Sequence, residues 1–434
     1  MTPRRTVAAL AALAVVGLAG FAVVAWKPEI APIRRPAAGD FAPDEVRRGA
    51  TLATLGDCAV CHTADNGVPY AGTIYAGGRP LATPFGTLYA TNITPDEATG
   101  IGRWSKDAFR RAMRDGVARD GSHLYPALPY DHYTHVTDGD LDALYAYLMT
   151  RPAVEAKAPE NSLIPPLGFR PLLAGWKLLF LETGGIAPDP AQSDAWNRGR
   201  YLVEGLGHCG SCHTPRNLAG AEERSKAFAG GVAEGWNAPP LDASSAAARG
   251  WTAETLYTYL RTGLSPRQGA AAGPMEPVVH GLSSAPEEDV RAIATYIGSV
   301  MELKASKEPA PVPPPVDRAA EAASANPEGA ALFAGACAGC HGDGAPMVAQ
   351  GRPPLSHADA VQAGDPRNAV QAILQGLKPS SGGAGPYMPP FRDSLTDGQV
   401  AQVAAYVRTR FSEKPAWPKL ADAVAEAKRE GSPQ

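Results

Sequence analysis

The stretch WNRGRYLVEGLGHCGSCHTPRN, residues 196–217, contains a helix-like segment that runs into Cys209-Gly-Ser-Cys212-His213. Two further copies of Cys-x-x-Cys-His lie at residues 58–62 and 337–341. The three copies use all six cysteines of the 434-residue chain. This regular use of cysteine, at a length that suits two to four domains, predicts three similar domains with one motif each.

Cys-x-x-Cys-His is the attachment sequence of a c-type haem. Two thiols about one helical turn apart can each bond to a vinyl group, and the adjoining imidazole becomes the fifth iron ligand. We therefore predict three covalently bound haem c groups. The thiols would be those of Cys58, Cys61, Cys209, Cys212, Cys337 and Cys340, and the iron ligands His62, His213 and His341.

Two other interpretations fit a single copy of the motif, namely a disulfide or redox dithiol in an exported chain, and a zinc site. The histidine follows directly in all three copies. Moreover, no unit contains a second Cys-x-x-Cys or a His-x3-His at zinc spacing, and no βαβ pattern surrounds the motifs. These features favour haem attachment.

The sequence after each motif repeats as well. A middle helix is predicted for WSKDAFRRAMRDG, WTAETLYTYLRTG and DPRNAVQAILQG, which end at Gly116, Gly263 and Gly376, where a helix C-terminus favours positive φ. A closing helix is predicted for TDGDLDALYAYL, SAPEEDVRAIATYI and TDGQVAQVAAYV, with apolar residues at i, i+3 and i+7. Its capping pairs would be Thr137 with Asp140, Ser284 with Glu287, and Thr396 with Gln399.

These repeats predict an all-α fold of three tandem cytochrome c-like domains after an N-terminal signal or membrane anchor. The expected boundaries are 1–27 for the signal peptide or anchor, 41–150 for domain 1, 151–193 for a linker, 194–303 for domain 2, 304–322 for a Pro-rich linker, 323–413 for domain 3, and 414–434 for a C-terminal tail.

The N-terminus places Arg4 and Arg5 before a charge-free run over residues 7–26. That run has about the 20 residues that a membrane span needs. Cleavage after Ala25 is the alternative to an uncleaved anchor. In both cases the arginines stay inside and the body is exported, which predicts the periplasmic side of a bacterial inner membrane.

The first linker contains PLLAGWKLLFL from Pro171, which is more apolar than a plain linker requires. We expect it to pack on a neighbouring domain, and the alternative is a contact with a membrane surface or a partner. The net charge of −4, from 40 basic and 44 acidic residues, gives no basic stripe for nucleic acid.

Methionine as a sixth ligand raises the reduction potential of a haem. Met275, in GPMEPV, lies twelve residues after Gly263, and Met388, in YMPPF, lies twelve residues after Gly376. Because the chain has only seven methionines, and a methionine in a Pro-rich loop is poor core material, we predict that both bind iron. Met347 is a weaker competitor of Met388.

The corresponding position of the first domain, twelve residues after Gly116, is Leu128 in LYPALPY. Met113 cannot replace it, because it belongs to the buried face of the middle helix. The first iron is therefore five-coordinate or bound by a histidine, and a second histidine would give that haem the lowest potential of the three. The candidate histidines are His123, His132 and His135.

Asn92, Thr94 and Trp104, in TPFGTLYATNITPDEATGIGRW, are candidates for hydrogen bonds to haem propionates. Trp104 recurs as Trp251, which favours an architectural role for it. A turn-rich cover over the haem is the simpler interpretation of that stretch.

On these residues the chain, from about residue 41 to residue 411, resembles the triheme cytochrome c subunits of membrane-bound bacterial dehydrogenases. The resemblance rests on the attachment motifs and on TPFGTLYATNITPDEATGIG, LYPALPYDHY, WNRGRYLVEGLGHCGSCHTPRN and MPPF. It implies an electron-transfer subunit that accepts electrons from a catalytic subunit and passes them to ubiquinone or a terminal oxidase.

Two branches of that family differ at Leu128. The branch paired with quinoprotein alcohol dehydrogenases, with its gluconate and sorbitol relatives that have flavin partners, usually carries methionine there. The form LYPALPYDHYTHV, followed by GWKLLFL, is closer to the branch that accompanies molybdenum hydroxylases acting on aldehydes or on N-heteroaromatics such as nicotinate. The resemblance thus implies a molybdopterin subunit with an iron–sulfur subunit as partner, with a quinoprotein or flavoprotein as the alternative.

No catalytic triad, paired carboxylates or phosphate loop predicts substrate chemistry by this polypeptide, so we expect substrate oxidation to belong to the partner. A haem enzyme is the alternative, with a catalytic five-coordinate first haem of the peroxidase or thiosulfate dehydrogenase kind.

Overall fold

The computed structural model describes residues 15, 17, 19–64, 74–244, 250–303, 311–342, 344–345, 347, 352–377 and 387–430. The chain divides into two compact units. The first is Met1–Pro188 with Glu204–His208 and Leu218–Ala221, and the second is Asp189–Val203, Cys209–Asn217 and Glu222–Gln434. Parts of the predicted N-terminal segment (1–14, 16 and 18) and of the Pro-rich linker (304–310) lie outside the described residues.

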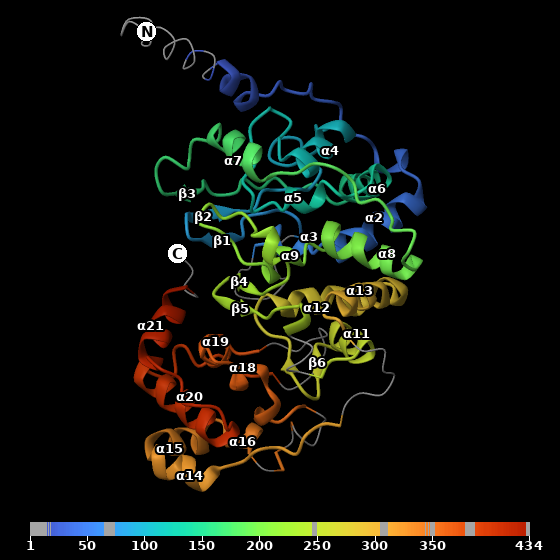
Figure 1. Cartoon of the computed structure of the whole chain (residues 1–434). Helices are drawn as coiled ribbons and strands as arrows, with labels where there is room; N and C mark the ends of the chain where they lie inside the picture. Colours follow the sequence, from blue (N-terminus) through green and yellow to red (C-terminus); the bar gives the residue numbers. More distant parts are fainter. Residues whose placement is uncertain are drawn as a thin grey trace, which may run out of the picture. The chain divides into compact units, whose positions relative to one another are not determined.

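The first unit is built from helices and one small antiparallel sheet (Figure 1). Its helices are α2 (Pro43–Leu55), α3 (Cys58–Cys61), α4 (Lys106–Asp115), α5 (Tyr130–Tyr133), α6 (Asp138–Met149) and α7 (Leu172–Phe180). The sheet has the order β1-β2-β3, from Pro80–Thr83, Gly86–Tyr89 and Ser162–Leu163. Sequence reasoning treated the β1–β2 hairpin as turns only.

The second unit repeats this helical series twice. The helices of its first half are α8 (Asp194–Tyr201), α9 (Gly210–His213), α11 (Ala253–Thr262), α12 (Met275–Ser284) and α13 (Glu287–Val300). A π-helical segment, Leu202–Leu206, continues α8, and its residues from Glu204 on belong to the first unit. Two short hairpins accompany them, β4–β5 (Gly231–Ala233, Trp236–Ala238) and β6–β7 (Leu264–Ser265, Gly269–Ala270).

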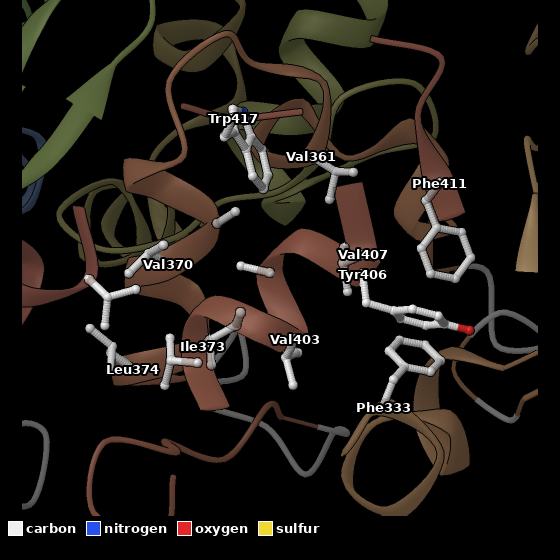
Figure 2. Packing of buried hydrophobic residues seen from close by; sticks show 14 of the residues in the cluster. Phe333, Val361, Val370, Ile373, Leu374, Val403, Tyr406, Val407, Phe411 and Trp417 are labelled. Atoms are coloured by element: carbon white, nitrogen blue, oxygen red, sulfur yellow. The ribbon is translucent and has the colours of Figure 1, made fainter. Parts of the chain in front are cut away.

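The second half of this unit contains α14 (Ala319–Ala325), α15 (Pro327–Ala336), α16 (Ala338–His341), α18 (Asp359–Gln362), α19 (Arg367–Gln375), α20 (Asp397–Phe411) and α21 (Leu420–Glu430). Aromatic rings from α15 and α20 pack together in its core (Figure 2). The ring centroid of Phe333 lies 5.3 Å from that of Tyr406 and 5.8 Å from that of Phe411. The segment after residue 413 also joins this core, because Trp417 and Val424 are buried in it.

Most closing-helix predictions are confirmed, and one is wrong. Thr137 accepts a hydrogen bond from the Asp140 N–H, and Thr396 forms a full capping box with Gln399. Ser284 does not cap α13, which begins at Glu287 after Pro286. The reason is that α12 continues to Ser284, whose hydroxyl instead donates to the carbonyl of Gly281.

The helix before each motif crosses a closing helix at a glycine. The two backbones are in van der Waals contact there. A Cβ atom at this glycine would overlap a backbone carbonyl oxygen of the closing helix, so a larger residue does not fit. The three glycine–carbonyl pairs are Gly49 with Ala143, Gly199 with Ala292, and Gly329 with Gln402. The same close crossing therefore forms three times, although sequence reasoning did not single out these glycines.

Changing Gly329 to alanine should destabilise the third repeat, because the new methyl group forces α15 away from α20. We expect a loss of about 1–3 kcal/mol in the free energy of unfolding, as overpacking typically costs. Gly335 is the matched control, since it lies in the same helix and a Cβ added there would meet nothing within 4 Å. Gly335→Ala should be neutral or stabilise by about 0.5–1 kcal/mol. Equal thermal midpoints for the two variants would contradict the crossing.

Two polar residues expected near haem propionates have a different role. The Asn92 side-chain amide donates to the carbonyl of Val154 (2.7 Å), and the Thr94 hydroxyl donates to the Asn92 side chain (2.7 Å). Both side chains are buried, and they hold the start of the 151–193 segment against the loop after β2. The propionate prediction for them is therefore not supported, because their hydrogen-bonding groups are used within the fold.

Candidate haem sites

Each attachment motif forms one tight helical turn that follows α2, α8 with its π-helical continuation, or α15. The backbone N–H of the motif histidine donates to the carbonyl of the first cysteine: His62 to Cys58 at 3.1 Å, His213 to Cys209 at 3.0 Å, and His341 to Cys337 at 2.9 Å. Such a turn brings both thiols and the imidazole close together, as the predicted attachment requires. All six cysteines lie in the described ranges, and no disulfide joins any two of them.

Two motif histidines are oriented by a backbone carbonyl. His62 Nδ1 lies 2.7 Å from the oxygen of Thr91, and His213 Nδ1 lies 2.7 Å from the oxygen of Pro239. Because a carbonyl only accepts, Nδ1 carries the ring proton, and Nε2 keeps the lone pair with which an imidazole binds iron. The residues present in these two motifs therefore fit a haem iron.

Burial supports the same conclusion for the protonation state. Desolvation lowers the pKa of His62 and of His341 below that of a free imidazole. A metal ligand must be the neutral imidazole, so burial keeps these rings in the ligating form at neutral pH.

The sequence did not predict that the carbonyls of Thr91 and Pro239 are the partners of these histidines. Every residue has a backbone carbonyl, and only the fold determines which one meets the imidazole. One signal was available: Pro-Pro-Leu occurs at residues 239–241 and again at 353–355.

Met275 is the first residue of α12, preceded by Pro274. The turn before it depends on Gly273, at φ +55°, where a side chain would overlap the indole ring of Trp236. Trp236 is itself buried on β5. The indole thus supports the turn that presents Met275, and its ligand role stays a prediction.

Met388 lies in a different local structure. It forms an isolated antiparallel bridge with Leu377, with backbone N–H···O distances of 3.0 and 2.9 Å. Gly376, at φ +71°, allows this approach, because a side chain there would overlap the carbonyl oxygen of Met388. Met388 also packs at the edge of the third repeat's core, and its ligand role likewise stays a prediction.

Met275 and Met388 thus have different local structures, although each lies twelve residues after the glycine that ends its middle helix. In the second repeat Leu264 pairs with Ala270, and Met275 follows five residues later. In the first repeat Val117 pairs with His123, and Leu128 follows five residues later. Leu128 is thus the structural counterpart of Met275, which agrees with the correspondence inferred from sequence.

Buried tyrosines lie beside the first motif. Burial raises the pKa of both Tyr133 and Tyr75 well above the ordinary value, and the hydrogen bond with Tyr147 adds to the shift of Tyr75. The ring of Tyr75 meets that of Tyr147 edge to face, with centroids 6.1 Å apart, and their hydroxyls are 3.4 Å apart. These neutral phenols give the first site an aromatic wall that sequence reasoning did not assign.

The three histidines near Leu128 are not equivalent. His123 is buried and both ring nitrogens have partners, Nε2 at 3.2 Å from the carbonyl oxygen of Val24 and Nδ1 at 2.9 Å from Lys177 Nζ. His132 and His135 each place Nδ1 at a backbone carbonyl, at 2.7 and 2.6 Å. The fold therefore removes His123 from the candidates for the sixth ligand, because neither of its nitrogens is available to iron.

The His123 contacts make the first unit sensitive to acid. Burial first, and then the positive charges of Lys177 and Lys27, lower the pKa of His123 in the folded state, whereas the unfolded chain takes up the proton near pH 6.5. Neutral His123 therefore contributes fully to the stability of the folded state above about pH 6.5. This contribution is lost as the pH falls from about 6.5 to the pKa of His123 in the folded state.

We expect the thermal midpoint of the native chain to fall more steeply between pH 7 and pH 5 than that of His123→Gln, measured by circular dichroism. Parallel curves for the two proteins would contradict this linkage.

Known proteins resemble the chain over nearly its whole length. A cytochrome c family model matches residues 46–152, and a model described as cytochrome C oxidase, cbb3-type, subunit III matches residues 324–407. The fructose dehydrogenase cytochrome subunit of Gluconobacter japonicus is 37% identical over 89% of this chain and 83% of its own length. The cytochrome c subunit of the quinone alcohol dehydrogenase of Gluconacetobacter polyoxogenes is 34% identical over 89% of this chain and 85% of its own. The chain belongs to the family of dehydrogenase cytochrome c subunits.

One subunit of the nicotinate dehydrogenase of Pseudomonas putida is 47% identical over 93% of this chain. The chain spans only 33% of the length of that relative. Members of this family are electron-transfer subunits with covalently bound haem c, so the family does not favour the alternative of a haem enzyme. No helix among the described residues has the length and apolar character to cross a bilayer.

Proposed function

We propose that this chain is a triheme electron-transfer subunit on the periplasmic side of a bacterial inner membrane. It accepts electrons from a dehydrogenase catalytic subunit and delivers them to ubiquinone or a terminal oxidase. The observation that carries this proposal is the threefold repeat in which a Cys-x-x-Cys-His turn follows a helix that crosses a closing helix at a glycine.

In this proposal, domains 41–150, 194–303 and 323–413 hold one haem each, and residues 1–27 hold the chain at the membrane. The cysteine pairs attach the haems, and His62, His213 and His341 bind the irons. Met275 and Met388 are the sixth ligands in the second and third domains, while the first has His132, His135 or no sixth ligand.

Haem c supplies one-electron redox chemistry when it is bound. The chain's own residues determine its environment. The carbonyls of Thr91 and Pro239 accept the Nδ1 protons of His62 and His213, so Nε2 of each ring would be the atom that binds iron. Tyr75 and Tyr133 line the first site with neutral aromatic groups that exclude water.

A molybdopterin subunit with an iron–sulfur subunit is the partner we favour. Leu128 in place of methionine and the similarity to the nicotinate dehydrogenase of Pseudomonas putida support this choice. The test is to purify the tagged chain in mild detergent and identify the co-purifying subunits and their cofactors. Molybdenum with iron–sulfur clusters is the expected result, whereas a quinoprotein or flavoprotein would assign the chain to the alcohol or sugar branch. Peroxide turnover by the isolated chain would overturn the electron-transfer assignment.

A further inference from the structure

Helix α7 (Leu172–Phe180) has one face packed on the first unit and one face exposed. On the packed face Ala174 is buried, and the Trp176 ring meets the buried Tyr130 ring edge to face, with centroids 6.0 Å apart. On the other face Leu178 and Leu179 are 70% and 76% exposed. Water disfavours exposed leucine side chains, so two adjacent exposed leucines on a nine-residue helix make this face a candidate contact surface.

The apolar character extends along the segment that leads into α7. Ile164 and Phe169, which precede this helix, are also more than half exposed. We call Ile164, Phe169, Leu178 and Leu179 the α7 patch. Residues 164–179 thus contain several exposed large apolar side chains, whereas exposed apolar residues on protein surfaces are usually scattered singly.

The end of the N-terminal apolar run is fixed beside α7. The carbonyl of Val24 accepts from His123 Nε2, and the carbonyl of Pro28 accepts from Arg111 Nη1 at 2.8 Å. Two residues further on, the backbone N–H of Ile30 donates to the carbonyl of Arg119 at 2.9 Å. The chain therefore leaves the first unit at its Gly116–His123 loop. The side chains of Val23 and Trp26, at this exit point, are largely exposed.

The side chain of Lys177, on α7, links this helix to the loop where the N-terminal segment leaves the first unit. Lys177 Nζ lies 2.6 Å from each of the carbonyl oxygens of Asp115 and Gly116, and 2.9 Å from His123 Nδ1. An ammonium has three protons for these three acceptors, and the neutral His123 then donates from Nε2 to Val24. This chain of hydrogen bonds ties α7 to the end of the N-terminal run.

We propose that the α7 patch lies in the interfacial region of a phospholipid bilayer, as a second membrane contact beside the N-terminal segment. The inference rests on the proposed function, in which residues 1–27 hold the chain at a membrane. A segment that enters the bilayer next to Trp26 brings α7 to the same lipid surface, because His123 and Lys177 connect the two directly. With nine residues α7 is too short to span, so its leucines enter only the boundary of the headgroups and acyl chains. Trp26 and Lys27 suit the same depth, where tryptophan and basic residues gather.

The test places an environment-sensitive nitrobenzoxadiazole label on the full haem-loaded chain, in vesicles of phosphatidylethanolamine and phosphatidylglycerol. The positions are Leu179→Cys and, as a second reporter, Leu178→Cys; Leu218→Cys is the matched control, because Leu218 is fully exposed and lies outside the patch. Emission is compared between vesicles with ordinary and with brominated acyl chains. Energy transfer to haem is the same in both, so it cancels in the ratio.

We expect brominated lipid to cause a loss of emission at positions 178 and 179 and none at 218. The same emission ratio at all three positions would overturn the proposal. Labels at 178 and 179 that ignore bromine but become shielded from aqueous iodide in the intact dehydrogenase complex would also overturn it, and would assign the patch to the catalytic subunit.

Intact mass of the purified chain separates this result from the proposed function. Loss of residues 1–25 would remove the anchor, yet quenching at 178 and 179 would still support the α7 contact. Reduction of the haems by the catalytic subunit tests electron transfer independently of either.

Discussion

Replacing Cys209 and Cys212 together by serine is expected to lower the haem content of the purified chain from three per polypeptide to two. Both thioether bonds of the second site would be lost, and His213 alone does not retain a haem through denaturation. The measurement is the pyridine haemochrome absorbance per chain, combined with the intact mass. The same loss of one haem is expected for the pairs Cys58 with Cys61 and Cys337 with Cys340.

Ser211→Ala is the control, because Ser211 lies between the two cysteines and has no part in attachment. It should retain all three haems. Cys209→Ser alone, which leaves one thioether at Cys212, serves if the double variant is degraded. A native chain with a haem ratio other than three, or a double variant that keeps three haems, would contradict the predicted attachment.

Replacing Met388 by histidine should shift the reduction potential of one haem strongly downward. A thioether ligand favours the ferrous state and an imidazole does not, and axial ligands set haem potentials over a range of roughly 0.8 V. Spectroelectrochemical titration of the visible haem bands measures the shift. Met347→His is the matched control, since Met347 is the other methionine near the third motif, and it should leave all potentials in place.

The converse change tests the first domain. Leu128→Met should raise the potential of the lowest haem, because Leu128 occupies the position that Met275 has in the second domain. If Met388→His left all potentials unchanged and Met347→His lowered one, Met347 and not Met388 would be the sixth ligand of the third haem.

The fold class and the attachment motifs follow from short-range patterns. Cys-x-x-Cys-His, the caps Thr137 and Thr396 and the helix-ending Gly116 and Gly263 all act within about one helical turn, so their geometry depends on neighbours in sequence. The wrong cap at Ser284 shows the limit of such patterns. Its residue types fit a capping box, but the preceding helix continued through it.

The α7 segment shows the same limit from the other side. Its apolar residues predicted packing on a neighbouring domain, with a surface contact as the alternative. The structure packs one face of the helix on the first unit and leaves Leu178 and Leu179 exposed on the other, so the surface contact stays a proposal.

Residues adjacent in the chain thus predict the haem attachment, the repeats and the types of the helices, because a helical turn needs no distant partner. Tertiary packing decided the rest. The carbonyl of Thr91 serves His62 from 29 residues away, and Val24 reaches His123 across 99. No sequence pattern marks a backbone carbonyl, so only packing selects the one that orients an imidazole. Packing also explains why His123 is a poor candidate for an iron ligand. Both of its ring nitrogens have hydrogen-bond partners, the Val24 carbonyl and Lys177 Nζ, which lie close to it only in the folded chain.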